Sequence, residues 1–226
     1  SAAVGLLGGL GAFLVAVAVL VYTFGPHDLD TDIDAIVHAR DDEAQGAALE
    51  RLIGPCPLEE DACKAAGVNA VFREALQRWF GTIFWFAVLG IYGAVLYRLA
   101  DRIDEGGLGL PAGQQDLFRR LRQVLDWPVA QLMTLSLAIA TDFDAVFKAW
   151  RKYHDQRGHG LFEGSNEFLY TAARQAVLSG EVTKDGYADQ LDGPLSCLKQ
   201  AMDLVWRMLF VWLTVLAILL LIDVIA

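Results

Sequence analysis

A run of sixteen uncharged residues in the middle of the chain constrains the fold more than any other feature. It extends from Thr82 to Tyr97, with Arg78 and Arg98 just outside its two ends. At about 1.5 Å per residue, roughly 20 apolar residues cover the hydrocarbon core of a bilayer. Arginine stems can lie along the apolar zone while their charged heads reach the interface. We therefore predict a membrane-spanning helix over 80–98.

Three glycines, Gly81, Gly90 and Gly93, lie within or beside this run. They would weaken a helix exposed to water, but in lipid they let a second helix approach closely. The alternative is a fully buried helix of a soluble domain. Two further apolar runs, at 2–24 and 204–225, disfavour that alternative, and we predict that both also span the membrane.

The composition agrees with lipid contact and disfavours nucleic acid as a partner. Hydrophobic residues make up 55% of the chain, more than one soluble core of this length requires. The formal net charge is −10, from 18 Lys and Arg against 28 Asp and Glu. No basic stripe offsets this balance. We expect the lipid bilayer as a partner, with another membrane protein or a second copy of the chain beside it.

Two polar segments, 27–79 and 99–203, separate the apolar runs, and we predict that both consist mainly of amphipathic helices. A short helix that carries Arg119, Arg120 and Arg122 suits either the anionic cytoplasmic leaflet or an ordinary solvated face. Alternating aspartates in the first segment lack the glycine and glutamate that a calcium loop requires. We therefore assign no metal site.

A short membrane-embedded helix is predicted over 127–141. Asp126 can cap such a helix, and Pro128 is tolerated in a first turn. The uncharged part is too short to cross a bilayer, so other helices must support it. We expect the helix to continue beyond the membrane to about Lys152.

Two cysteines, Cys56 and Cys63, lie in the first polar segment. Their spacing does not fit a metal-binding pair, which normally has two to four intervening residues and further ligands. They form a disulfide if this segment faces an oxidising compartment, or they are two separate thiols. The sequence leaves both alternatives open.

Basic residues predict the orientation of the chain. The first polar segment holds five Lys and Arg, whereas the region from Arg98 to Lys199 holds twelve. Cytoplasmic loops are enriched in basic residues. We therefore expect residues 98–203 in the cytoplasm and the acidic first segment on the opposite side.

Four short stretches and a lone C-terminal apolar run follow one another in the order found in a known family. The stretches are Gly25-Pro-His-Asp-Leu29, Arg78-Trp-Phe-Gly-Thr-Ile-Phe-Trp-Phe86, Gly90-Ile-Tyr-Gly-Ala-Val-Leu-Tyr-Arg-Leu99 and Leu125-Asp-Trp-Pro128. Together they resemble AmpE, a family of bacterial inner-membrane proteins associated with β-lactamase induction. Members usually begin with another apolar segment, so we expect residues upstream of Ser1.

The resemblance implies a multi-pass protein of the bacterial inner (cytoplasmic) membrane that acts as an accessory or signalling modulator, without catalysis and without a cofactor. AmpE is in turn similar to the CobD/CbiB proteins of cobalamin synthesis, which join an aminopropanol unit to the corrin side chain. A CobD/CbiB-like membrane synthase that forms an amide is thus the alternative. A structural subunit of a larger membrane complex is a third interpretation. Whether the chain is an enzyme stays open.

The predicted fold is a single all-α, polytopic integral membrane domain with three spanning helices, one short embedded helix and amphipathic helices in the loops. We assign no catalytic residue. Candidate contacts to lipid, ligand or polar partners are Arg78, Arg98, Asp101, Arg102, Asp126, Trp127 and Arg207. An enzyme would need a cavity between the central helix and the helix that starts at Asp126-Trp127-Pro128, with Arg98, Asp101 and Asp126 facing into it.

Overall fold

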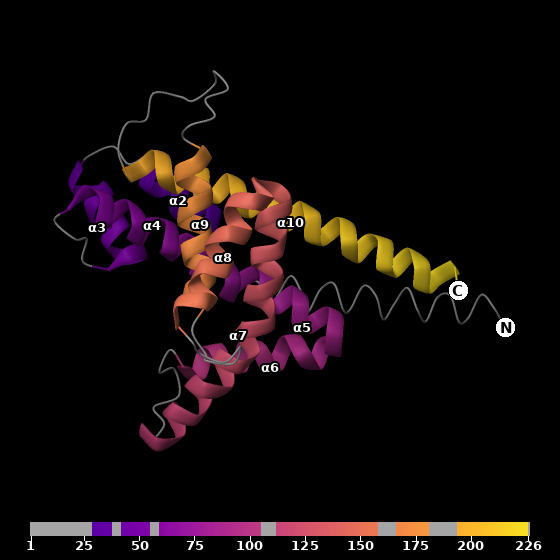
Figure 1. Cartoon of the computed structure of the whole chain (residues 1–226). Coiled ribbons are helices and arrows are strands. Elements are labelled where there is room, and N and C mark those ends of the chain that lie inside the picture. The colour runs from indigo at the N-terminus through magenta and orange to yellow at the C-terminus, as the bar shows by residue number, and fades with distance from the viewer. Residues whose placement is uncertain are drawn as a thin grey trace.

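The structure is a computed structural model of the chain, and it describes residues 29–37, 42–54, 59–104, 112–157, 166–180 and 194–225 (Figure 1). Every regular element in these ranges is helical, as predicted. The first predicted span, at 2–24, and Cys56 lie outside the described residues. Cys63 is disulfide-bonded, whereas Cys197 is a buried thiol.

The first polar segment folds into helices that pack on the rest of the molecule. Leu29, Ile33 and Ile36 recur at helical spacing and are fully or almost fully buried, so they fix the first helix against its neighbours. Gly54, with φ of 84°, ends the next helix in a conformation that favours glycine. The helices are α2 (Leu29–Val37), α3 (Asp42–Ile53) and α4 (Glu60–Ala75).

The core lies where α4 and α7 each pack against α9 and α10. Small residues such as Ala172, Ala173 and Ala201 are completely buried there, which lets the helix backbones approach closely. Larger side chains such as Phe72 and Met208 fill the space between them. The bounds are α7 (Ala112–Ala140), α8 (Phe143–Arg157), α9 (Glu167–Gly180) and α10 (Pro194–Ile225).

The predicted single span over 80–98 is wrong as one straight helix. α4 continues through a π turn, η1 (Leu76–Phe80), into α5 (Gly81–Leu89), but the chain then reverses into α6 (Ile91–Asp104). The reversal occurs at Gly90, whose φ of 66° and ψ of −149° are accessible to glycine and strained for other residues.

The other two glycines close this α5–α6 hairpin. A Cβ on Gly81 would overlap the ring of Tyr97, and one on Gly93 would overlap the carbonyl oxygen of Trp85. Both contacts therefore join one arm to the other. The sequence correctly predicted a close helix neighbour at these glycines, but the neighbour is the other half of the same segment.

The predicted start of a short helix at Trp127 is also wrong. α7 begins at Ala112 and runs for 29 residues with Pro128 in its interior. Proline removes a backbone donor and disturbs the carbonyls of the preceding turn. The indole Nε1 of Trp85 donates a hydrogen bond of 3.2 Å to the carbonyl oxygen of Leu125, three residues before the proline. A neighbouring helix thus supplies a hydrogen bond in the turn that precedes the proline.

The predicted continuation of this helix to Lys152 is replaced by a turn and a new helix. Asp142 Oδ1 accepts hydrogen bonds from the backbone N–H groups of Asp144 at 2.9 Å and Ala145 at 3.4 Å. Asp142 is thus the N-cap of α8, which begins after α7 has ended. Asp142 therefore begins a new helix where the prediction had one helix continue.

Among the described residues, one helix is long and apolar enough to cross a membrane. It is the stretch Ser196–Ile218 of α10, and 28% of its most apolar part is buried inside the molecule. This stretch contains residues 204–218 of the predicted span at 204–225. The number of crossings made by the whole chain stays a prediction.

Candidate functional site

Five polar side chains meet where α6 packs against α7. We call them the α6–α7 cluster: Tyr97, Arg98, Asp101, Arg122 and Asp126. Asp101, Arg122 and Asp126 are only 5%, 7% and 5% exposed, and Tyr97 is 1% exposed. Charged residues are rarely buried to this extent unless they are paired. The cluster is therefore the most unusual concentration of polar chemistry among the described residues.

Arg122 connects the two helices through both carboxylates. Its Nη2 lies 2.8 Å from Asp101 Oδ1 on α6, and its Nε lies 3.6 Å from Asp126 Oδ2, one turn later on α7. The shorter contact is an ion pair by distance but lacks the angles of a hydrogen bond. On the other side, Arg98 Nη1 donates a hydrogen bond of 3.4 Å to Asp101 Oδ2. Each carboxylate thus faces at least one guanidinium.

Tyr97 links the cluster to the hairpin. Its hydroxyl donates a hydrogen bond of 2.6 Å to Asp126 Oδ1 and lies 3.5 Å from the carbonyl oxygen of Leu76 in the π turn. The shorter contact uses the single hydroxyl proton, because a neutral phenol has only one to donate. The absent side chain of Gly81 makes room for the ring. Tyr97 therefore depends on both hairpin arms for its position.

A second tyrosine, Tyr170 on α9, interacts electrostatically with Asp126 and Arg122 of the cluster. The pKa of Tyr170 is raised from 10.0 to about 12, first by burial and second by the negative charge of Asp126. Beyond it, Arg174 donates hydrogen bonds to Asn69 on α4 at 2.9 Å and to Thr171 at 3.0 Å. Tyr170 thus places a polar group of α9 within electrostatic range of Asp126 and Arg122.

The cluster is balanced in charge, with two guanidiniums against two carboxylates. Such a set can bind an ammonium group through Asp101 and Asp126, or a carboxylate or phosphate through the arginines. Tyr97 can donate or accept a proton at its hydroxyl. Among the described residues, no group of His, Cys, Asp and Glu has the arrangement of a metal site. The geometry thus favours recognition of charged or hydroxyl groups.

The structure brings together three of the predicted site residues and separates the others. Arg98 pairs with Asp101, and Arg122 joins Asp101 to Asp126. Arg78 instead pairs with Glu74 at 2.9 Å on its own helix. Trp127 is half-buried against the apolar core, while Arg102 and Arg207 are exposed. A functional role for any of these residues stays a prediction.

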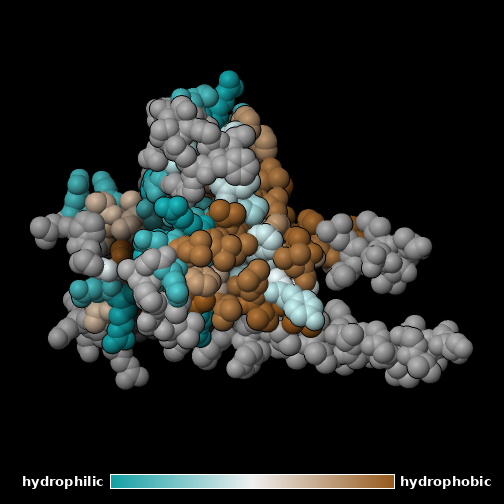
Figure 2. All heavy atoms as spheres, turned by 90° about the horizontal axis from the view of Figure 1, so that it is seen from below, coloured by the Kyte–Doolittle hydropathy of each residue, from teal (hydrophilic) through white to brown (hydrophobic). Residues whose placement is uncertain are grey.

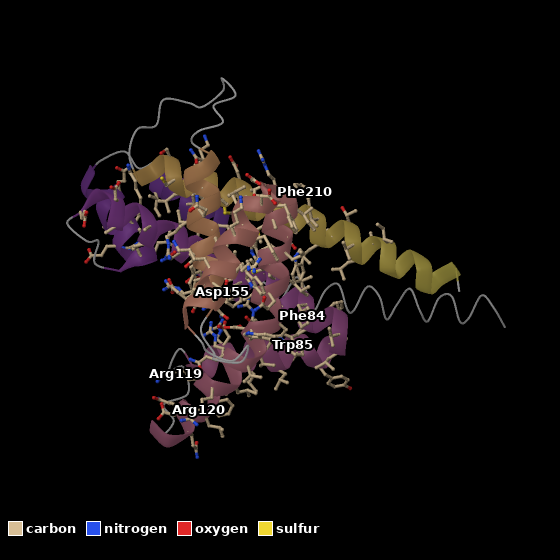
Figure 3. The ribbon with its side chains drawn as sticks, in the orientation of Figure 1. Phe84, Trp85, Arg119, Arg120, Asp155 and Phe210 are labelled. Atoms are coloured by element: carbon tan, nitrogen blue, oxygen red, sulfur yellow. The ribbon has the colours of Figure 1, made fainter. Side chains whose placement is uncertain are left out.

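Arg122 and Tyr97 were not predicted as members of a site. Arg122 was grouped with Arg119 and Arg120, which lie on the protruding end of α7 (Figure 3). The spacing in the sequence could have placed Arg122 in the site, because Arg122 and Asp126 are four residues apart and so share a face of the helix. Tyr97 and Asp101 have the same spacing on α6.

Comparison with known proteins identifies distant relatives. The chain is 25% identical over 169 residues to the cobalamin biosynthesis protein CobD of Stutzerimonas stutzeri, a match that covers 70% of this chain and 55% of that protein. It is 43% identical over 47 residues to the protein of the same name from Chromobacterium violaceum, which covers 21% of this chain and 15% of that protein. This chain therefore spans little more than half the length of the first relative. No protein-family model and no solved structure matches it.

These relatives change the order of the functional hypotheses. Both carry the name of the alternative that the sequence suggested, and the similarity to the first extends over most of this chain. Neither comparison supports the AmpE assignment or a role in β-lactamase induction.

Proposed function

We propose that this chain acts in cobalamin biosynthesis as part of a CobD-like membrane protein. One observation carries the proposal: the similarity to CobD of Stutzerimonas stutzeri over 169 residues, 70% of the chain. The apolar helix α10 supports placement at a membrane. The β-lactamase role becomes the competing outcome of the test below.

The α6–α7 cluster is the proposed recognition site within this function. An amide-forming reaction of the kind that the family resemblance implies must hold an amine and a carboxylic acid together. Asp101 and Asp126 match the first group and Arg98 and Arg122 match the second. The pairing of these residues with each other keeps the charges balanced until a ligand replaces one contact.

The test is complementation in the strain that encodes the protein. We expect deletion of the complete gene to abolish growth that depends on endogenous cobalamin, and added cobalamin to restore it. The complete gene carrying Asp101→Asn should fail to complement. If the deletion leaves cobalamin synthesis intact and alters β-lactamase induction, the proposal is wrong.

A matched control separates the site from the general effect of losing an aspartate. Asp116 also lies on a helix of this region and also pairs with an arginine, Arg119 at 3.3 Å, but its side chain is 68% exposed. Asp116→Asn should complement fully, because exposed ion pairs contribute little. The amount of each variant in membranes, measured by immunoblot, shows whether a loss reflects folding. Failure of both variants at normal amounts would remove the cluster from the proposal.

A further inference from the structure

The α5–α6 hairpin exposes an apolar surface that nothing in the described chain covers. Tyr92, Val95, Leu96 and Leu99 lie at helical spacing on one face of α6 and are 87%, 48%, 45% and 52% exposed. Val88 and Leu89, at the tip of α5, are also about half exposed. No charged residue occurs between Gly81 and Tyr97. A surface of this kind is costly in water.

This surface is continuous with the apolar face of α10. The rings of Phe80 and Phe84 lie 5.1 Å and 6.4 Å from that of Trp212, and Trp79 lies 5.4 Å from Trp206. Trp79 and Phe80 belong to η1 and Phe84 to α5, so these pairs bring η1 and the start of α5 against α10, with the two chains running in the same direction. Figure 1 shows the hairpin and the end of α10 projecting toward the same side of the helical body. Hydrophobic residues gather toward that side in Figure 2, and hydrophilic residues gather toward the opposite side.

The depth of the hairpin can be estimated from α10. Trp212 lies five residues beyond Arg207, or about 8 Å into the apolar part of α10 at 1.5 Å per residue. α5 extends a further five residues from Phe84 to Leu89, about another 8 Å. The tip is thus about 15 Å below the level of Arg207, or half of a hydrocarbon core of about 30 Å. α10 itself continues to Ile225 and crosses the remainder.

The two arginines that border the uncharged run agree with this depth. Because Tyr97 packs on Gly81 and the arms are antiparallel, Arg78 and Arg98 lie at the same open end of the hairpin. Their charged heads can therefore reach the same interface. In a single crossing helix, the two arginines would lie at opposite interfaces.

We propose that α5 and α6 form a re-entrant hairpin that enters the acyl chains of one leaflet, turns at Gly90 near the bilayer midplane and returns to the same side. The N-terminal helices α2–α4 and the first half of α7 then face the same aqueous compartment. This topology replaces the orientation predicted from the basic residues, which placed residues 27–79 and 98–203 on opposite sides. It does not depend on the proposed function.

Single cysteines on the full chain in sealed vesicles test the topology. Glu50→Cys on α3 precedes the hairpin in the sequence, and Gln114→Cys on α7 follows it. Both substitutions introduce an exposed thiol. We expect a membrane-impermeant maleimide to label both in the same vesicle preparation and neither in vesicles of opposite orientation. The parent chain gives the background from its own cysteines. Labelling of the two positions from opposite sides would overturn the proposal.

A depth measurement tests what covers the hairpin. Tyr92→Cys, carrying an environment-sensitive fluorophore, should be quenched most strongly by nitroxides near the ends of the acyl chains. The same fluorophore on Gln114→Cys should be quenched by headgroup nitroxides at most. Quenching of Tyr92→Cys at the headgroup level only, or disulfide crosslinking of two copies through this position without lipid quenching, would overturn the proposal. Tyr92 is 87% exposed, so its replacement leaves the packed core untouched.

Discussion

At the scale of single residues, Gly90 carries a backbone conformation that no other residue type adopts without strain. No atom lies within 4 Å of a Cβ at this position, so Gly90→Ala tests conformation without a clash. We expect a cost of about 1–3 kcal/mol. At roughly 2–4 °C per kcal/mol for a chain of this size, the melting temperature in detergent should fall by several degrees. Fluorescence-detected thermal unfolding measures the shift.

Gly46 provides the control for that substitution. It lies inside α3, is exposed, and also has no atom within 4 Å of a Cβ. Because alanine favours a helix over glycine by about 1 kcal/mol, Gly46→Ala should raise the melting temperature slightly. Equal losses in the two variants would contradict the strain assigned to Gly90.

Tyr170 should titrate later than an ordinary tyrosine. Its pKa in the folded protein is raised from 10.0 to about 12, first by burial and then by the charge of Asp126. The neutral phenol is the favoured form, so its contribution to stability is complete below pH 10 and is lost as the pH rises toward 12. The difference in near-ultraviolet absorbance between the parent and Tyr170→Phe isolates this group. A difference curve centred at or below pH 10 in the folded protein would refute the prediction.

At the scale of the elements, the hairpin depends on contact between its arms. A Cβ on Gly93 would overlap the backbone carbonyl of Trp85, which cannot yield as a flexible side chain could. Gly93→Ala should therefore separate α5 from α6 and expose Arg98, whose side chain is 18% exposed in the intact hairpin. Limited trypsin digestion in detergent should cleave after Arg98 several-fold faster than in the parent. An unchanged rate at Arg98 would mean that the arms separate without opening the cluster, or not at all.

The elements also show what the sequence could and could not predict. Local periodicity predicted the helical class and the presence of helices in both polar segments. It did not give the turn at Gly90, because an uncharged helix and an uncharged hairpin have the same composition. It placed a helix start at Pro128, because proline is favoured in a first turn, whereas α7 already runs from Ala112.

The candidate site could be predicted only in part from the sequence. Arg98, Asp101 and Asp126 attracted attention as charges beside apolar runs, and the structure places them together. Arg122 was assigned to the surface because its sequence neighbours are exposed arginines. Its burial follows from the tertiary contact between α6 and α7, which a single sequence does not reveal.

At the scale of the whole molecule, two apolar surfaces lie on one side of a helical body that is hydrophilic on the opposite side (Figure 2). We expect the full chain to sediment with membranes on high-speed centrifugation and to stay there after an alkaline carbonate wash. Detergent should be needed to release it. Recovery in the supernatant of lysed cells without detergent would contradict both the α10 crossing and the hairpin.

The π turn η1 has a consequence for how the sequence can change over evolution. Each residue of an α-helix advances the direction of the following side chains by about 100°. A π turn holds about one residue more than an α turn, so loss of one residue between Leu76 and Phe80 would restore an α turn and leave the direction of α5 relative to α4 nearly unchanged. Phe84 would still face Trp212, and Gly81 would still receive the ring of Tyr97. A lineage could therefore gain or lose this one residue without rebuilding either interface.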